Sequence, residues 1–575
     1  MSMAHQPCGY LRKCSTSTSI RRLPNTRMSL GVLTWREFKR LYHFRSAINL
    51  HLLTLSICRS GSGQPFASEF QIYPPDLVHK AVGRFITEIV LQTFVPYKFH
   101  PRRAQFEPKL EEERVYIEEL VIKEHAWQEH TTMSREAYSI TVSQVGKTVI
   151  HALSPEGILR ALDTLTQLFY AHSKTDEVYT PFAPVSIRDA PIFEHRGLNL
   201  DISRNWIPPE DVLRTIDAMA LNKLNKLHLH CTDAQSWPLE VPAIPSLAIE
   251  GAYREDQIWS VRDLHQVQHY GLYHGVEVYL EIDLPGHTAS IHHSHPQLIT
   301  AYNQPWATYA CQPPTGQLKL NSPDVPLFLT TLLDDLLPRS ASFSGHFHVG
   351  GDELNREAYN LDSAVASSSK EVIRPHLQRL MDHVLSLVQS HGLTSVMWED
   401  MLLEWDLQLP ASTIIQTWRS STSLASVVAK GYRALFGPCQ DWYLDCGYGT
   451  TIDPDPANPD TPIKKPFRDW CSPYKNWRQM LSYDPLKDIP EFQRHLVIRG
   501  ECHLWGELTD SVNLDNMLWP PVAAAAEVMW RGKGEVGEGA TRRLAEMRER
   551  LVARGVRAGM VQMEWGLRNE GTCIL

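Results

Sequence analysis

Two adjacent carboxylic acids follow a short apolar run near the middle of the chain, in the sequence His348-Val-Gly-Gly-Asp-Glu353. Two neighbouring carboxyl groups can divide acid–base work, because one can exchange a proton while the other stays charged. Consecutive residues of a regular strand point to opposite faces. Gly350 and Gly351 could loosen the backbone enough for Asp352 and Glu353 to reach one pocket. Taken alone, the motif is equally compatible with a surface turn.

Similar side chains follow other strand-like runs of the sequence. Carboxylates, histidines and aromatic rings come directly after these runs, and a purely structural role gives no reason to gather so much costly buried charge. The residues concerned are Asp201, Ser203 and Arg204, then Asp233, Asp283 and His287, then Trp398-Glu399-Asp400 and Trp418, and finally Trp442-Tyr443-Leu444-Asp445 and Trp505-Gly506-Glu507.

The elements that must position these residues alternate between strands and helices. Helical periodicity covers 208–224, 371–391 and 423–431. Eight strand-like runs are predicted at 195–203, 226–233, 276–283, 346–349, 394–398, 412–418, 433–443 and 495–505. This alternation predicts an α/β fold, a (β/α)8 TIM barrel, over residues 191–575. Such a barrel carries its active site on the loops after the strands, so we expect these residues to meet at one rim.

A small α+β domain is predicted before the barrel, over residues 69–190. Residues 136–142 alternate as a strand should, and residues 148–152 form a second short strand. Ser154 and the proline after it are typical of a helix start. Residues 1–68 are basic and serine-rich at first, then mildly apolar, and we expect them to be a poorly ordered extension or targeting segment outside the fold.

Composition limits the possible functions. The chain has 575 residues and a net charge of −9, which argues against a nucleic-acid partner because such proteins concentrate basic side chains on one face. It contains no apolar run of about 18 residues, so no membrane span is predicted. The 16 tryptophans fall largely beside strand-like runs, where their rings could stack on sugars. For any single tryptophan, core packing is the more common explanation.

Glycoside hydrolysis is the reaction that best uses several carboxylates and tryptophans without an obvious metal or nucleotide site. It needs a carboxylic acid that protonates the leaving oxygen and negative charge near an oxocarbenium-like carbon. We therefore expect no cofactor and no metal. One alternative is a metal-dependent hydrolase, since His228 and His230 have the spacing of a metal-binding pair on a strand. The other is a catalytically weak sugar-binding protein on the same fold.

The full set of motifs resembles glycoside hydrolase family 20, the β-N-acetylhexosaminidases, over roughly residues 70–575. The resemblance rests on motifs that occur in family order: His195-Arg-Gly, Asp201-Ile-Ser-Arg204, His228-Leu-His-Cys-Thr-Asp233, Glu281-Ile-Asp-Leu-Pro-Gly-His287, His348-Val-Gly-Gly-Asp-Glu353, Trp398-Glu, Gln416-Thr-Trp418, Trp442-Tyr-Leu-Asp445 and Gly500-Glu-Cys-His-Leu-Trp505-Gly-Glu507.

This resemblance implies an exo-acting, retaining enzyme that uses the substrate's own 2-acetamido oxygen as the nucleophile and passes through an oxazolinium intermediate. Glu353 would be the general acid and later the base, and neighbouring negative charges would keep it protonated. Asp352 would orient the acetamido group. The other residues implied to bind substrate are Arg196, Asp233, His287, Trp398, Trp418, Tyr443, Asp445, Trp505 and Glu507. The implied substrate is an oligosaccharide or glycan that ends in an N-acetylhexosamine, and the family also allows a homodimer.

The sequence departs from the family pattern in its cysteines. Cys446 and Cys471 fit one expected disulfide. Cys311 and Cys573 each fit half of another, but Ala358 and Gly566 stand at the partner positions. The chain has no Asn-x-Ser/Thr sequon, and this absence, together with the lost cysteine partners, weakens the expectation of a secreted or vacuolar protein. Smaller departures are Leu229 and Ala234, which replace a tryptophan and a second aspartate of many members.

Overall fold

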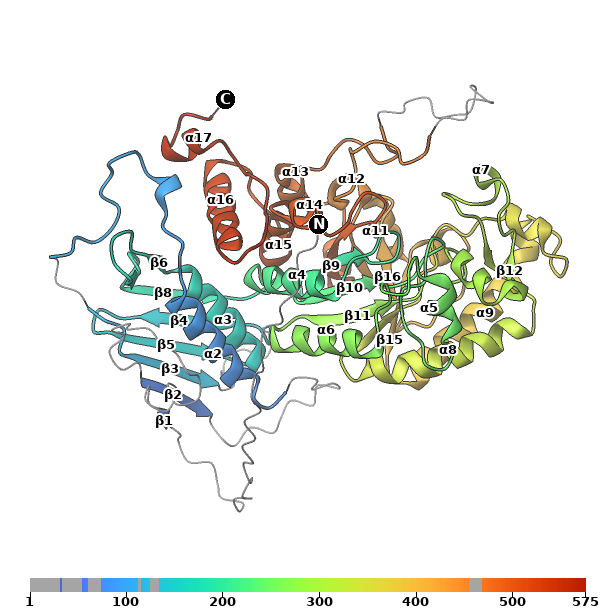
Figure 1. The fold of residues 1–575 in the computed structure, drawn as a ribbon, viewed down its shortest axis with the longest axis horizontal. Helices are drawn as coiled ribbons and strands as arrows, with labels where there is room; N and C mark the ends of the chain where they lie inside the picture. Colours follow the sequence, from blue (N-terminus) through green and yellow to red (C-terminus); the bar gives the residue numbers. More distant parts are fainter. Residues whose placement is uncertain are drawn as a thin grey trace, which may run out of the picture.

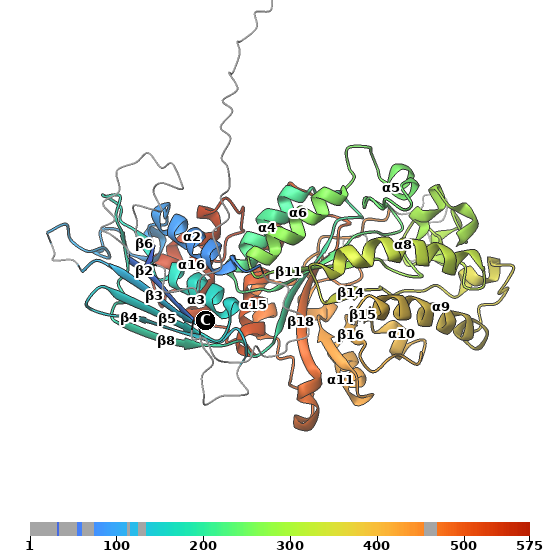
Figure 2. The same ribbon diagram turned by 90° about the horizontal axis from the view of Figure 1, so that it is seen from below.

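The computed structural model describes residues 32–33, 54–59, 74–111, 115–124, 134–453 and 468–574. They form a sheet domain followed by a closed barrel, which lie side by side in Figures 1 and 2. Both parts of the predicted architecture, a small α+β domain and a (β/α)8 barrel, are confirmed. Within these ranges, every helix is too short or too polar to cross a membrane.

The first domain is a six-stranded sheet with the order β1-β2-β3-β5-β4-β8. Helices α2 (Leu77–Val90) and α3 (Pro155–Gln167) pack against it through one apolar cluster. Ser154 caps α3 as predicted, because its side chain accepts the backbone N–H of Gly157. The strands are β1 (Val32–Leu33), β2 (Thr54–Arg59), β3 (Glu119–Glu124), β4 (Tyr138–Val142), β5 (Lys147–Ala152) and β8 (Val185–Asp189).

The predicted start of this domain at residue 69 differs from the structure. Strands β1 and β2 precede it, and β2 pairs in parallel with β3, in the register Thr54 to Glu119 through Arg59 to Glu124. Strand β2 was not predicted from the sequence because its partner β3 lies about sixty residues away and the short apolar run resembled a targeting segment. The rest of the predicted 1–68 extension lies outside the described residues.

The barrel closes in the order β10-β11-β14-β15-β16-β17-β18-β9, with every neighbouring pair parallel. Each predicted strand is present: β9 (His195–Asp201), β10 (Lys226–His230), β11 (Glu277–Glu281), β14 (His346–His348), β15 (Thr394–Trp398), β16 (Ile414–Thr417), β17 (Arg433–Phe436) and β18 (Val497–Leu504). The larger helices are α4 (Pro209–Leu221), α6 (Val261–Tyr273), α8 (Asp324–Ala341), α9 (Lys370–Ser390), α11 (Ser421–Ala429), α15 (Pro521–Arg531) and α16 (Glu538–Ala553). Shorter helices sit in the loops: α5 (Ser246–Gly251), α7 (Trp306–Tyr309), α10 (Asp400–Leu403), α12 (Cys439–Trp442), α13 (Trp477–Ser482), α14 (Leu514–Leu518) and α17 (Glu564–Arg568).

A buried ionic cluster joins the two domains. Glu136 of the sheet domain accepts hydrogen bonds from Arg160 on α3 and from Arg196 on β9, each at 2.7 Å. Burial alone would raise the pKa of Glu136, but the two guanidinium groups lower it to about 2. Breaking such a cluster is costly, because it leaves buried charge without a partner.

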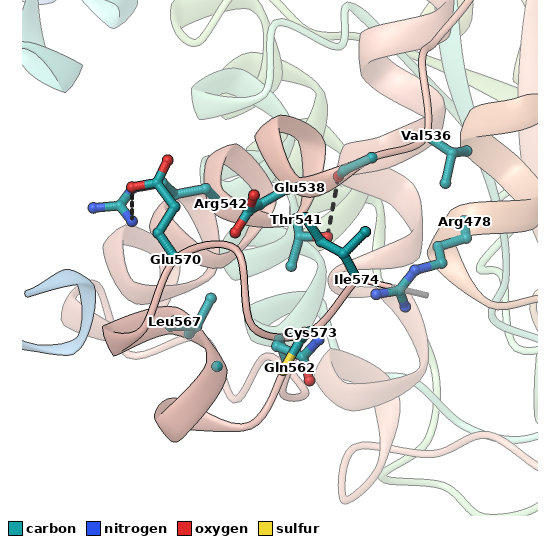
Figure 3. A pocket seen from close by; sticks show the side chains of 12 residues that line it. Arg478, Val536, Glu538, Thr541, Arg542, Gln562, Leu567, Glu570, Cys573 and Ile574 are labelled. Atoms are coloured by element: carbon teal, nitrogen blue, oxygen red, sulfur yellow. Dashed lines mark hydrogen bonds and ion pairs between the residues drawn. The ribbon is translucent and has the colours of Figure 1, made fainter.

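The C-terminal segment covers one end of α16. Figure 3 shows the pocket of about 170 Å³ that Cys573 lines beneath this segment. A Cβ atom added to Gly566 would lie 2.6 Å from the Cys573 sulfur. The backbone therefore brings these two positions within bridging distance, although the chain has only one of the two cysteines.

Candidate active site

The loop after β14 brings the two predicted carboxylates to the rim of the barrel. Gly350 and Gly351 have φ angles of +69° and +108°, and a Cβ at Gly350 would lie 1.8 Å from Asp283 Oδ1. Only glycine fits so close an approach. Glu353 itself has a φ of +52°, and its N–H donates to Asp400 Oδ1 at 3.2 Å. The left-handed backbone is thus held by Asp400, the first residue of α10, which follows the neighbouring strand β15.

Glu353 faces a histidine on one side and a pocket on the other. His287 Nε2 lies 3.4 Å from its Oε2, and His287 Nδ1 lies 3.1 Å from Asp233 Oδ1. Although burial would raise the pKa of Glu353, the hydrogen bond and charge of His287, with the charge of Arg204, lower it. A neighbouring pocket of about 290 Å³ is lined by Cys311, Glu353, Leu354, Asn355, Arg356, Glu357, Glu404 and Arg419.

Asp352 has the opposite electrostatic setting. Burial and the nearby charge of Asp283 raise the pKa of Asp352 well above its usual value. Its buried Oδ1 has no hydrogen-bond partner among the described residues. In the substrate-free protein, Asp352 is therefore the group that favours a proton. This reverses the prediction that neighbouring negative charges keep Glu353 protonated, because His287 and Arg204 supply positive charge that the sequence did not reveal.

Four aromatic side chains that the resemblance implied to bind substrate form one wall. Trp398, Trp418, Tyr443 and Trp505 belong to one buried cluster. Trp398 is fully buried, and its indole N–H donates to Glu281 at 2.7 Å. Trp418 donates to Asp400 Oδ2 at 2.9 Å. Trp398 and Trp505 have ring centroids 5.9 Å apart. These two bonds fix the indole planes of Trp398 and Trp418 before any ligand arrives.

The loop that carries Tyr443 and Asp445 is held by a disulfide. Cys446 and Cys471 form this bond, as the family resemblance implied. The other predicted disulfide halves, Cys311 and Cys573, are free thiols.

Arg196 was predicted to bind substrate, and the structure contradicts this role. It lies near the amino end of β9, fully buried, where it bonds Glu136 and the backbone oxygens of Phe193 and Lys223. A TIM barrel presents its site at the opposite ends of the strands, so Arg196 is on the wrong side.

Arg204, which follows the carboxyl end of β9, takes the place at the site. Its guanidinium lies 2.9 Å from Asp201, 2.9 Å from Asp233 and 3.5 Å from Glu507. It also lies over the Trp505 ring, 5.0 Å from the centroid. The sequence placed Arg204 at a strand end but assigned it no role.

Asp445 and Glu507 complete this side of the site. Burial raises the pKa of each carboxyl, and the charge of Glu507 adds to the effect on Asp445. One oxygen of each is buried without a hydrogen-bond partner among the described residues. Such oxygens suit acceptors for ligand hydroxyl groups.

The histidines that suggested a metal-dependent hydrolase contact carboxylates. His230 contacts Glu281 at 2.6 Å and Asp233 at 2.9 Å, so both of its nitrogens are engaged. His228 contacts Glu281 and Glu501 at 3.0 and 3.1 Å. Its ring stacks on His348 with centroids 4.6 Å apart. His228, Glu281 and His348 nevertheless bring one donor atom each to within 4.8 Å of one another, so these three side chains could also hold a metal ion.

A closed parallel barrel whose rim gathers carboxylates beside an aromatic wall has the features of a glycoside hydrolase. A model of glycosyl hydrolase family 20, catalytic domain, matches residues 193–533, and one described as beta-acetyl hexosaminidase like matches residues 32–168. The chain belongs to glycosyl hydrolase family 20.

Similar proteins come from fungi, insects and bacteria. A beta-hexosaminidase of Arthroderma benhamiae is 46% identical over 533 residues, which span 90% of this chain and 88% of that protein. A chitooligosaccharidolytic beta-N-acetylglucosaminidase of Ostrinia furnacalis is 28% identical, across 93% of this chain and 87% of its own. The family 20 exo beta-N-acetylglucosaminidase of Vibrio harveyi, solved with N-acetylglucosamine, shares the fold with a TM-score of 0.68 at 22% identity, covering 85% of this chain and 74% of that one.

Proposed function

We propose that Glu353 is the general acid and base of this enzyme and that Asp352 orients the 2-acetamido group of its substrate. The chain is a β-N-acetylhexosaminidase that releases terminal β-linked GlcNAc or GalNAc with retention of configuration. The observation that supports the residue roles is the pairing on one glycine-hinged loop of a carboxyl that faces an open pocket, Glu353, with one that has an unpartnered buried oxygen, Asp352.

The reaction divides into two steps on these groups. The acetamido oxygen bonds to the anomeric carbon while the glycosidic bond breaks, and the leaving oxygen takes the proton of Glu353. Asp352 accepts a hydrogen bond from the acetamido N–H and balances the positive charge of the oxazolinium. Water then attacks the anomeric carbon as its bond to the acetamido oxygen breaks, which restores the acetamido group. The attacking water gives a proton to Glu353, which restores the acid.

Substrate binding shifts the proton from Asp352 to Glu353. In the free protein the proton favours Asp352, whereas catalysis needs it on Glu353. The Glu353 side chain is 27% exposed, so a bound sugar would cover it and favour its neutral form. An acetamido N–H that donates to Asp352 would favour the charged form of that carboxyl. Both changes move the proton in the same direction.

The geometry favours release of one terminal sugar. Arg204, Asp445 and Glu507 close the hydroxyl-binding side, next to the aromatic wall. The pocket of about 290 Å³ on the far side of Glu353 would receive the leaving saccharide, whose hydroxyl groups suit its polar lining. The net charge of −9 supports a carbohydrate rather than a nucleic-acid partner. A homodimer also fits the family, and analytical ultracentrifugation would test it.

The test is the Glu353→Gln variant assayed on an aryl N-acetyl-β-glucosaminide with a poor leaving group. We expect turnover to fall by roughly 10³-fold or more, and by less when the leaving group is good, because a good leaving group needs little protonation. Glu357→Gln, in the same pocket lining, is the matched control and should keep most of its activity. Near-normal turnover by the Glu353 variant would refute the assignment, and a folded wild-type protein without turnover would favour a sugar-binding protein.

A further inference from the structure

Beneath the proposed acid, histidines and carboxylates alternate in one line that runs into the barrel. From the rim inward, the successive contacts are 3.4, 3.1, 2.9 and 2.6 Å, and they join Glu353, His287, Asp233, His230 and Glu281. The three inner members of this line are buried in the barrel, with 0% or 1% of each residue exposed. The line therefore connects the proposed acid to charge that no solvent reaches.

The geometry fixes the proton count of His230. Its Nδ1 faces Glu281 and its Nε2 faces Asp233, both within hydrogen-bond distance. A neutral imidazole carries one N–H and one lone pair, so a neutral ring would turn a lone pair toward one of these carboxylates. Only the imidazolium donates to both. The charges of Glu281 and Asp233 act in the same direction, since they raise the pKa of His230 well above its usual value against the effect of burial.

We propose that His230, held as an imidazolium between Glu281 and Asp233, is a positioning residue that sets the proton affinity of Glu353 through Asp233 and His287. The positive charge of His230 offsets part of the negative charge of Asp233. Without it, the potential at His287 and at Glu353 becomes more negative, so Glu353 binds its proton more tightly. The proposal rests on Glu353 being the general acid.

Other charged groups lie around this line of side chains and also act on its proton affinities. His230 also lies near Asp201 and touches the edge of the Trp505 ring. Around Glu281 are His228, His348 and the indole N–H of Trp398. The groups around Asp233 and Glu353 are Arg204, Asp283, Asp352, the Cys311 thiol and Asp400, which accepts a hydrogen bond from the backbone N–H of Glu353. A substitution at His230 alters none of these residues, so a change in proton affinity would report the lost imidazolium.

The experiment compares His230→Gln with wild type through the pH dependence of kcat on an aryl N-acetyl-β-glucosaminide. The alkaline limb of kcat reports the acid of the enzyme–substrate complex, in which the proton lies on Glu353. Loss of one buried cation that His287 and Asp233 separate from Glu353 should move this limb upward by about one pH unit. His503→Gln is the matched control. His503 is also fully buried in the barrel, but burial lowers its pKa to about 3, so it carries no charge and its loss should leave the limb in place.

A double variant and neutron diffraction test the role of His230 further. In an Asp233→Asn background, His230→Gln should move the limb less, because His230 then faces one carboxylate and one amide, and a neutral ring can satisfy both contacts. An unshifted limb in folded His230→Gln would overturn the proposal, while an active Glu353→Gln would instead overturn the assignment of the acid. If the variant does not fold, neutron diffraction from wild-type crystals at pH 7 should show deuterium on both His230 nitrogens, and a single deuteron would overturn the proposal.

Discussion

The structure places Arg204 at the site and Arg196 away from it, and replacing each arginine with lysine tests this reassignment. Arg204 contacts three carboxylates, two of them at 2.9 Å. A lysine keeps the charge but can serve only one or two of them, so about two charge-assisted contacts are lost, at roughly 1.5 kcal/mol each. These contacts position Asp233 and Glu507 at the site, so their loss should displace both carboxylates and lower kcat/KM by roughly 10²-fold.

The lysine variant of Arg196 should behave in the opposite way. Arg196 lies at the domain boundary and bonds Glu136 at 2.7 Å, so the variant should lower the free energy of unfolding by about 2–3 kcal/mol. Its kcat/KM should stay within about threefold of wild type. Hydrolysis of an aryl N-acetyl-β-glucosaminide and denaturant unfolding measure both quantities for both variants. A fall of kcat/KM in Arg196→Lys with unchanged stability, or normal kinetics in Arg204→Lys, would refute the reassignment.

Three other predictions concern stability and backbone geometry. The pKa of Glu136 lies at about 2, below its ordinary value of 4.5, so the charged carboxylate adds about 3 kcal/mol to the free energy of unfolding. This contribution is fully present above pH 4.5 and is lost as the pH falls toward 2. The unfolding free energies of Glu136→Gln and wild type, measured with denaturant, should therefore converge in acid, and a constant difference would contradict this. Gly350→Ala should reduce turnover by at least roughly 10²-fold with unchanged circular dichroism, because its methyl group would collide with Asp283 Oδ1, and normal turnover would show that the loop relaxes. Gly566→Cys should pair with Cys573 and stabilise the protein by about 2 kcal/mol, whereas two reactive thiols by mass spectrometry after alkylation would disprove the geometry.

The barrel could be predicted from the sequence because its signals are local. Each strand is a short apolar run, each ends in polar or aromatic residues, and helical periodicity separates several of them. Strand β2 could not be found in this way. Its pairing with β3 is parallel and joins segments far apart in the chain, so no turn between them marks the contact.

The site residues divide along the same line. Asp352 and Glu353 were found because a glycine pair and two carboxylates stand together in the sequence. Arg196 was misplaced because motif similarity was preferred to strand direction, although it stands second in β9 and Arg204 stands after the end of that strand. Asp400 and Glu281 received no role, and His230 was considered only as half of a metal-binding pair. Each has a partner that comes from another strand, and only closure of the barrel brings that partner within hydrogen-bond distance.

The opposed proton affinities of Asp352 and Glu353 give the acetamido group a second task besides attack at the anomeric carbon. A sugar with a plain 2-hydroxyl has no acetamido oxygen and therefore no nucleophile. It also lacks the N–H that would stabilise charged Asp352, so the proton stays on the carboxyl that already favours it. Such a substrate would lose the nucleophile and the protonated acid together. We therefore expect an aryl β-glucoside to be hydrolysed at least roughly 10³-fold more slowly than its 2-acetamido counterpart. We also expect Asp352→Asn to narrow that ratio, because the amide holds no proton to be moved, and an unchanged ratio would show that Asp352 takes no part in the discrimination.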